Sequence, residues 1–127
     1  MDDPNRKSLI DRYIAAYNAF DVEGMLALLA PDIVFENFSN GQRTSTVSGV
    51  DEFRRLAEAS TSLFSEREQR ITAWRQGPDH AVASIAYRGR LAVDMPDGPP
   101  AGTVLELQGE SEFAFADGLI SRIVDRS

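Results

Sequence analysis

The sequence predicts an α+β fold in which N-terminal helices pack into a curved, mainly antiparallel sheet. Three observations lead to this prediction. Apolar residues recur at helical spacing in the first third of the chain. From Glu66 onward the residues alternate as they do in β-strands. Short segments with turn chemistry join these strands, so consecutive strands should run antiparallel. Helices followed by a run of strands are typical of an α+β layout.

Two helices are expected before residue 31. Asp3 followed by Pro4 is a helix-start signal, because a carboxylate accepts the first unpaired amides and proline tolerates the first helical position. Asp21 is the N-cap candidate of the second helix, and Pro31 is expected to end that helix. The first helix carries its apolar residues three and four positions apart, at Ile10, Tyr13, Ile14 and Tyr17.

A strand and a third helix are expected next. The strand Ile33–Phe38 alternates and places Phe35 and Asn37 on the same face. Ser39–Ser48 is rich in Ser, Thr, Asn and Gly, which indicates a loop with a short strand near its end. Ser48–Asp51 resembles a capping box with Asp in place of Glu, so a helix should begin there. The buried side of that helix should carry Phe53, Leu56, Ala57 and Leu63.

Four strands are predicted in the second half of the chain. Three of them are long for their class, which favours a strongly curved sheet. The chain shows neither an internal repeat nor a linker that would divide it, so residues 1–127 should form one domain. The predicted strands are Glu66–Gln76, Ala81–Val93, Thr103–Ala116 and Leu119–Arg126.

Composition narrows the class of protein. A formal net charge of −7 argues against general binding to nucleic acid or to an anionic membrane, because both need basic patches. The chain has no cysteine, which excludes thiol chemistry and suits a reducing cytoplasm. The longest apolar run, Met25–Ala30, is too short to span a bilayer. We therefore expect a cytoplasmic protein without nucleic-acid or membrane partners.

Four segments resemble one known superfamily along nearly the whole chain. They are Arg12–Asp21, Leu28–Asn37, the helix start Gly49–Phe53 and Glu112–Ile123. These segments resemble the nuclear-transport-factor-2-like superfamily, which includes SnoaL-like polyketide cyclases, ketosteroid isomerases and limonene-epoxide hydrolases. The resemblance implies a cone: a curved sheet wrapped around a long helix, with a pocket at the wide end. It also implies a homodimer formed through the outer face of the sheet. The fold hosts many unrelated activities, so it does not fix the function.

The ketosteroid isomerase pattern is matched in part. Tyr13 stands where these enzymes place the tyrosine that hydrogen-bonds the developing enolate. Asn37 stands in place of their aspartate base, and an amide cannot accept a proton at neutral pH. Ser111 stands in place of their protonated aspartic acid. The resemblance therefore argues against ordinary ketosteroid isomerisation.

The epoxide-hydrolase pattern is matched differently. The resemblance implies that Asn37 helps to hold the attacking water and that Asp125 activates it. Arg88 matches the pocket arginine of that family if Met95–Gly98 is aligned with the family's corresponding turn, and Arg90 then replaces the second aspartate. SnoaL-like cyclases also use a late-strand aspartate as acid and base. Asp125 is thus the catalytic candidate shared by two subfamilies.

The residues themselves leave alternatives open. Asp125 shares a face with apolar residues of the last strand, where desolvation would raise its pKa and suit it to act as a base near neutral pH. It also lies two residues from the chain end, where fraying and solvation are the default. Alternation places Arg88 on the outer, polar side unless a bulge turns it inward. Trp74 lines either the pocket or a dimer interface.

Other polar residues give little sign of chemistry. His80 is expected in an exposed turn, and Glu66–Glu68 is expected to be solvated surface. The chain offers no second histidine or cysteine for a metal ligand set, and no motif implies an organic cofactor. Tyr17 and Tyr13 are core aromatics whose hydroxyls reach the wet end of the cavity, or they take part in chemistry.

The sequence leads to two hypotheses. The first is a pocket for a small hydrophobic molecule of polyketide, terpenoid or steroid type, with Asp125 as general acid and base for isomerisation, cyclisation or hydration. The second is a non-catalytic module of the same fold that binds a ligand or dimerises. The residues expected to contact the ligand are Tyr13, Tyr17, Phe35, Asn37, Trp74, Arg88 and Ser111.

Overall fold

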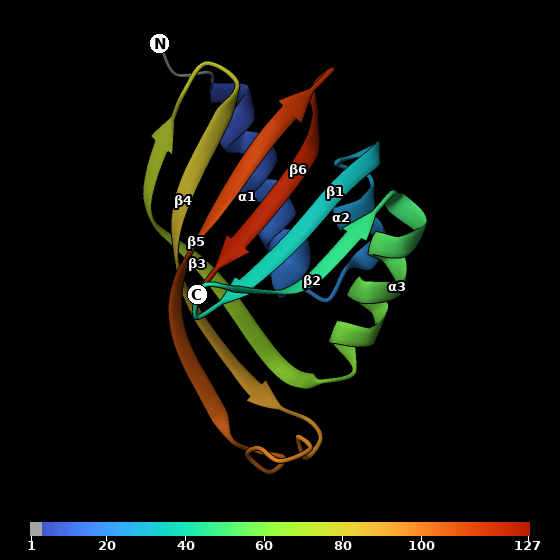
Figure 1. The fold of residues 1–127 in the computed structure, drawn as a ribbon, viewed down its shortest axis with the longest axis vertical. Helices are drawn as coiled ribbons and strands as arrows, with labels where there is room; N and C mark the ends of the chain where they lie inside the picture. Colours follow the sequence, from blue (N-terminus) through green and yellow to red (C-terminus); the bar gives the residue numbers. More distant parts are fainter. Residues whose placement is uncertain (1–3) are drawn as a thin grey trace.

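The computed structural model describes residues 4–127, which form three helices packed against one curved six-stranded sheet (Figure 1). The helices are α1 (Pro4–Asn18), α2 (Val22–Leu26) and α3 (Val50–Thr61). The strands are β1 (Leu29–Ser39), β2 (Gln42–Ser48), β3 (Phe64–Gln76), β4 (His80–Leu91), β5 (Val104–Ala116) and β6 (Leu119–Arg126). The predicted α+β class is confirmed, and the four C-terminal strands end within two residues of their predicted bounds.

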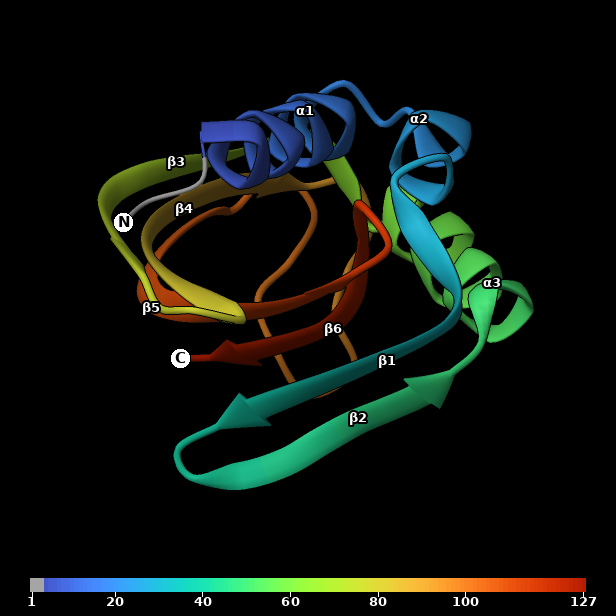
Figure 2. The same ribbon diagram turned by 90° about the horizontal axis from the view of Figure 1, so that it is seen from above.

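The sheet is mixed. Its strand order is β2-β1-β6-β5-β4-β3, and every neighbouring pair is antiparallel except β1 with β6. Viewed from above, the sheet curls from β3 around to β2, and the helices lie across its open side (Figure 2). The parallel pairing of β1 with β6 brings the first and last strands along the chain side by side.

The core lies between α1 and the concave face of the sheet. Ile10 of α1, Ile33 of β1 and Ile120 of β6 are completely buried and belong to one apolar cluster. Burying a side chain of this kind contributes about 1.5–3 kcal/mol to stability. The apolar stripe predicted for α1 therefore forms the centre of the fold. No helix among residues 4–127 is both long enough and apolar enough to cross a membrane.

The end of the second helix was wrongly predicted. Helix α2 ends at Leu26, and β1 already begins at Leu29, with Pro31 exposed inside the strand. Pairing with β6 explains the early change, because the Ile120 amide donates to the Leu28 carbonyl at 3.0 Å. The ladder is irregular between Leu29 and Val34, and proline is tolerated in strands at such irregularities.

The remaining boundaries are set by local turn and cap chemistry. Asp21 caps α2 as predicted and accepts a 2.9 Å hydrogen bond from the Gly24 amide, whereas Asp3 lies outside the described residues. The predicted capping box at Ser48–Asp51 is wrong: Gly49 is the N-cap of α3 and offers no side chain. The short strand predicted near the end of Ser39–Ser48, around Thr44–Val47, is present but longer: Gln42–Ser48 forms β2, the second strand of a hairpin with β1. The hairpin turns at Asn40 and Gly41, whose positive φ angles of 53° and 79° match a hairpin turn.

Candidate functional site

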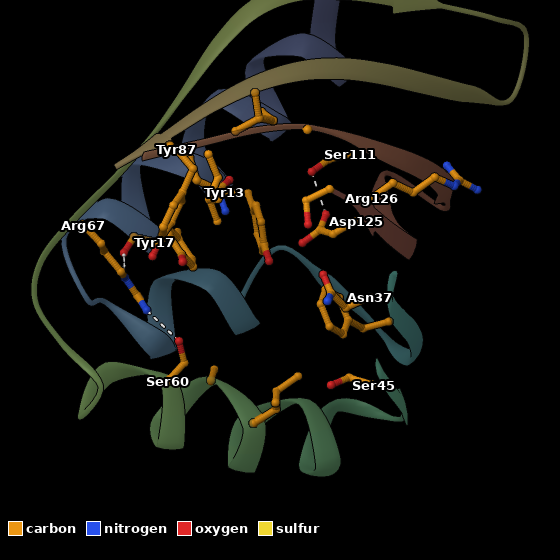
Figure 3. Close-up of a pocket in the computed structure, with 18 of the residues that line it drawn as sticks. Tyr13, Tyr17, Asn37, Ser45, Ser60, Arg67, Tyr87, Ser111, Asp125 and Arg126 are labelled. Carbon is orange, nitrogen blue, oxygen red and sulfur yellow. Dashed lines mark hydrogen bonds between the residues drawn. The ribbon is translucent and has the colours of Figure 1, made fainter. Parts of the chain in front are cut away.

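A cavity of about 520 Å³ lies between α3 and the concave face of the sheet (Figure 3). Every helix and strand contributes at least one side chain to its lining, so the cavity exists only in the complete fold. Its size falls within the usual range of small-molecule sites, about 300–1,000 Å³. Most of its charged and hydroxyl groups gather on two walls, one built on β6 and its neighbours and the other on β3 and the end of α1.

The first wall carries a row of polar side chains across four strands. Asn37 of β1 is paired in register with Ser45 of β2 on one side and with Asp125 of β6 on the other. Asp125 is in turn paired with Ser111 of β5. Residues directly opposite each other in a sheet project to the same face, so all four side chains enter the cavity. We call these four residues the polar row.

Asp125 is the acidic group of the polar row. It is partly buried, and the Ser111 hydroxyl donates a 2.6 Å hydrogen bond to its Oδ1 atom. Burial raises the pKa of Asp125 to about 6, although the hydrogen bond from Ser111 opposes that rise. No cation among the described residues contributes to this pKa. The carboxyl group therefore changes its protonation state close to neutral pH, as a general acid and base must.

Tyr13 faces the same cavity from α1. Its side chain is buried, and its ring packs edge-on against Phe113 at a centroid distance of 6.4 Å. Burial and, after it, the charge of Asp125 raise the pKa of Tyr13 well above its ordinary value. The phenol therefore stays protonated at neutral pH and can donate a hydrogen bond to a ligand oxygen.

Asn37 is held by a neighbour in the adjoining strand. Its Nδ2 atom donates a 2.8 Å hydrogen bond to Thr44 Oγ1. This contact fixes the orientation of the amide and occupies part of its donor capacity. Asn37 is thus suited to position a group beside Asp125 and cannot itself carry a proton.

The second wall contains a buried arginine that the sequence placed wrongly on the surface. Arg67 of β3 is only 6% exposed, although Glu66 and Glu68 on either side of it are exposed as predicted. The Arg67 guanidinium donates to the Tyr17 carbonyl at 2.9 Å and to Ser60 Oγ at 3.0 Å. Alternation along β3 was the available signal, since every second residue of a strand shares a face.

Tyr87 of β4 also belongs to this wall, although it was not among the predicted site residues. Its ring packs edge-on against Phe64 at 6.0 Å. Burial and the neighbouring Tyr17 hydroxyl raise its pKa, while the charge of Arg67 lowers it. Gly89 makes room for this packing, because a Cβ atom there would lie 2.9 Å from both the Phe64 ring and the Tyr87 hydroxyl. The shared face of Tyr87 and Ile85 was recognisable from alternation.

Six of the eight predicted site residues line the cavity: Tyr13, Tyr17, Phe35, Asn37, Ser111 and Asp125. Their roles in binding or catalysis stay predictions.

Trp74 and Arg88 do not line this cavity. Trp74 packs against the apolar core, with the Lys7 ammonium 5.8 Å from its ring centroid. Arg88 keeps 57% of its side chain exposed and lies 3.6 Å from Glu106. The register of β4 is unbroken around Arg88 on both sides, so the bulge needed to turn it inward is absent. His80 is exposed, as predicted.

The donor chemistry of the site does not suit a metal. Within residues 4–127, no group of three or more His, Asp or Glu side chains is arranged to hold a metal ion. The polar row supplies one carboxylate, one amide and two hydroxyls, which are groups suited to binding a neutral oxygen-containing molecule.

Comparison with known proteins identifies the family. A family model of the SnoaL-like domain matches residues 10–123. The chain belongs to the SnoaL-like domain family. This SnoaL-like chain has the cone fold of the nuclear-transport-factor-2-like superfamily, as the sequence predicted. A search of curated proteins returned no match.

Solved structures resemble this SnoaL-like chain over most of its length. A proposed polyketide cyclase from Xanthomonas campestris pv. campestris is 23% identical, with a TM-score of 0.81, covering 98% of this chain and 90% of its own. AclR, a proposed hydroxylase from Streptomyces galilaeus, is 22% identical with a TM-score of 0.75, covering 94% and 86%. A protein with a ketosteroid isomerase-like fold from Catenulispora acidiphila is 14% identical with a TM-score of 0.75, covering 92% and 82%. At these identities the likeness establishes the fold, which hosts diverse chemistry.

Proposed function

We propose that this SnoaL-like protein is a cofactor-independent enzyme that moves protons on a small hydrophobic carbonyl compound of polyketide, terpenoid or steroid type. The observation that carries the proposal is the position of Asp125, a carboxyl group inside the cavity with Ser111 as its hydrogen-bond partner. Its raised pKa supports the same role, because proton transfer is most effective when the pKa lies near the working pH.

The proposed reaction begins with Asp125 as a base. Its carboxylate removes a proton from the carbon next to the substrate carbonyl, and the electron pair of the broken C–H bond moves to form an enolate. The carbonyl oxygen, which gains negative charge, accepts a hydrogen bond from the Tyr13 phenol. Ser111 engages Oδ1 of Asp125, which leaves Oδ2 for the substrate.

The enolate then has two outcomes. In an isomerisation, protonated Asp125 returns its proton to a different carbon. In a cyclisation, the enolate carbon attacks a second carbonyl of the same molecule, and Asp125 gives its proton to the alkoxide that forms. Both outcomes regenerate the carboxylate and need no oxidant or external co-reactant.

Hydrogen–deuterium exchange tests this proposal without knowledge of the native substrate. The protein is incubated in deuterated buffer with 2-tetralone, a bicyclic ketone, and loss of the α-proton signals is followed by NMR. We expect the wild-type protein to accelerate exchange and Asp125→Asn to lose about 10²–10⁴-fold of that acceleration, the usual contribution of a general base. Equal exchange with wild type and Asp125→Asn would overturn the proposal.

A binding role without chemistry is the second candidate. The amide at position 37 favours it, because Asn37 stands where ketosteroid isomerases place their base and cannot accept a proton. Under this reading the protein binds ketones in the cavity but leaves their α-proton exchange at the rate in buffer. Asp125→Asn would then bind the same ketones with unchanged or higher affinity.

A further inference from the structure

Arg67 is a buried cation without a carboxylate partner among residues 4–127. Arg67 lines the cavity, and only 6% of the residue is exposed. The arginine ion pairs of the described residues involve Arg43, Arg54, Arg75, Arg88, Arg90, Arg122 and Arg126, all of them at least 41% exposed. A buried charge normally has an opposite charge beside it, so Arg67 requires an explanation.

The contacts of Arg67 fix the plane of its guanidinium. Its Nε atom donates to the Tyr17 carbonyl and Nη1 donates to Ser60 Oγ. The ring centroids of Tyr17 and Phe20 lie 3.7 Å and 4.4 Å from the Cζ atom of Arg67. Phe20 adopts a positive φ of 59°, which is strained for a bulky residue, and this conformation brings its ring to the arginine. The guanidinium is therefore held in place before any ligand arrives.

The guanidinium retains unused donors. Arginine has five N–H donors, and the hydrogen bonds within residues 4–127 use one on Nε and one on Nη1. Nη2 donates to no other group of the described residues. Every completely buried side-chain nitrogen or oxygen of residues 4–127 has a hydrogen-bond partner. Nη2 has no such partner, so it must be accessible to solvent, and Arg67 lines the cavity. The remaining donors of Nη1 and Nη2 share the plane of the guanidinium, and a planar pair of this kind matches the geometry of a carboxylate.

Arg67 and Asp125 lie on different walls. Figure 3 shows the two side chains well separated, with the tyrosines between them. A molecule whose carboxylate meets Arg67 would therefore extend its apolar body across the cavity toward the polar row. A carboxylate placed beside Asp125 instead would meet a like charge at neutral pH, and Arg126, the cation on that side of the cavity, is already paired with Glu112 at 3.0 Å.

We propose that Arg67 binds the carboxylate of the ligand, so that the substrate class of this site is a hydrophobic keto acid with its acid group at Arg67 and its ketone at Asp125. The orientation of the ketone rests on the function proposed above. The recognition of a carboxylate by Arg67 does not.

Arg67 also supports the fold, since it donates to the Tyr17 carbonyl in the last turn of α1, which accepts a second hydrogen bond from the Phe20 amide at 3.1 Å. Arg67→Met should therefore lower the melting temperature. A purely structural arginine would not distinguish an acid from its amide. The informative quantity is thus a ratio of affinities for two ligands of the same shape.

The experiment compares 2-naphthoate with 2-naphthamide by isothermal titration calorimetry at pH 8, where Asp125 and the ligand acid are both ionised. We expect wild type to bind the acid at least about tenfold more tightly than the amide, from charge-assisted hydrogen bonds. Arg67→Met should abolish the preference, and Arg67→Lys should retain part of it. Arg70→Met, an exposed cation on the same strand, is the matched control and should leave the ratio unchanged.

Two results would overturn the proposal: equal or tighter binding of the amide by wild type, or an unchanged preference in Arg67→Met. If Arg67→Met does not fold, the Arg67 Nε–H resonance of the wild-type protein decides, because it should shift with 2-naphthoate and not with 2-naphthamide. Asp125→Asn separates this proposal from the proposed function. This variant should lose proton exchange but keep the preference for the acid. If only the carboxylate-binding role of Arg67 is wrong, the wild-type protein should still exchange the α-protons of the neutral ketone 2-tetralone.

Discussion

The β6 side of the cavity and its β3 side each bury a charged group, but they hold it in different ways. Asp125 has one hydroxyl partner, and its pKa rises to about 6, so it can discard its charge by taking up a proton. Arg67 stays charged and is surrounded by a carbonyl, a hydroxyl and two aromatic faces. One wall is built to change its charge and the other to keep it.

The two charges are also kept apart. A salt bridge between them would favour the ionised form of Asp125 and would occupy both groups. Their separation on two walls of one cavity leaves each group available to a ligand (Figure 3). The variants below test this contrast between a titrating wall and a permanently charged wall.

Replacing the titrating group should have the largest effect. Asp125→Asn keeps the shape of the side chain but removes its ability to accept a proton, so proton exchange on 2-tetralone should fall by about 10²–10⁴-fold. NMR exchange rates provide the measurement. Arg70→Met, which alters an exposed residue of β3, is the control and should exchange like wild type.

The same substitution should stabilise the folded protein at high pH. The folded-state pKa of Asp125 is raised to about 6, so the stability linked to its proton is present below pH 3.8 and is lost as the pH rises through 6. Above pH 7 the ionised carboxylate costs about 3 kcal/mol, and Asp125→Asn removes that cost. Urea unfolding at pH 4 and pH 8 should show a gain at pH 8 that nearly vanishes at pH 4. A gain of the same size at both pH values would contradict the raised pKa.

Removing the partner of Asp125 should have a smaller effect. The Ser111 hydroxyl lowers the pKa of Asp125, so Ser111→Ala should raise that pKa further. The exchange rate should then reach its plateau at a higher pH than in wild type, with catalysis retained. A pH–rate profile of both proteins measures this. A midpoint that moved to lower pH would contradict the assigned hydrogen bond.

The smallest effect is expected outside the cavity. Arg88 is exposed, and its ion pair with Glu106 is on the surface. Arg88→Ala should change the free energy of unfolding by less than about 0.5 kcal/mol, which urea unfolding can measure. A loss above about 2 kcal/mol would show that Arg88 packs into the protein.

The sequence predicted one wall better than the other. Asp125 and Asn37 were predicted as pocket residues because both stand in strands with clear alternation, and the resemblance to known families pointed to the same two positions. Their direct pairing was not predictable, since it depends on the parallel pairing of β1 with β6. Strand pairing between segments far apart in the sequence leaves no local pattern.

Arg67 was missed for a different reason. Glu66 and Glu68 flank it, and a run of three charged residues resembles solvated surface. The contacts that bury it come from α1 and α3, which only the tertiary structure brings to β3. The end of α2 was predicted too late in the chain, because the helix was expected to continue up to Pro31. Pairing with β6 already makes the chain extended at Leu29. In each case a distant partner overrode the local signal.

The decisive measurement is the titration of Asp125 itself. The pH dependence of its side-chain carboxyl ¹³C shift can be recorded by NMR, with Asp125→Asn to assign the resonance. We expect a midpoint at about pH 6, because the carboxyl group is desolvated within the cavity. A midpoint at or below about pH 4, the ordinary value for an exposed aspartate, would contradict this expectation.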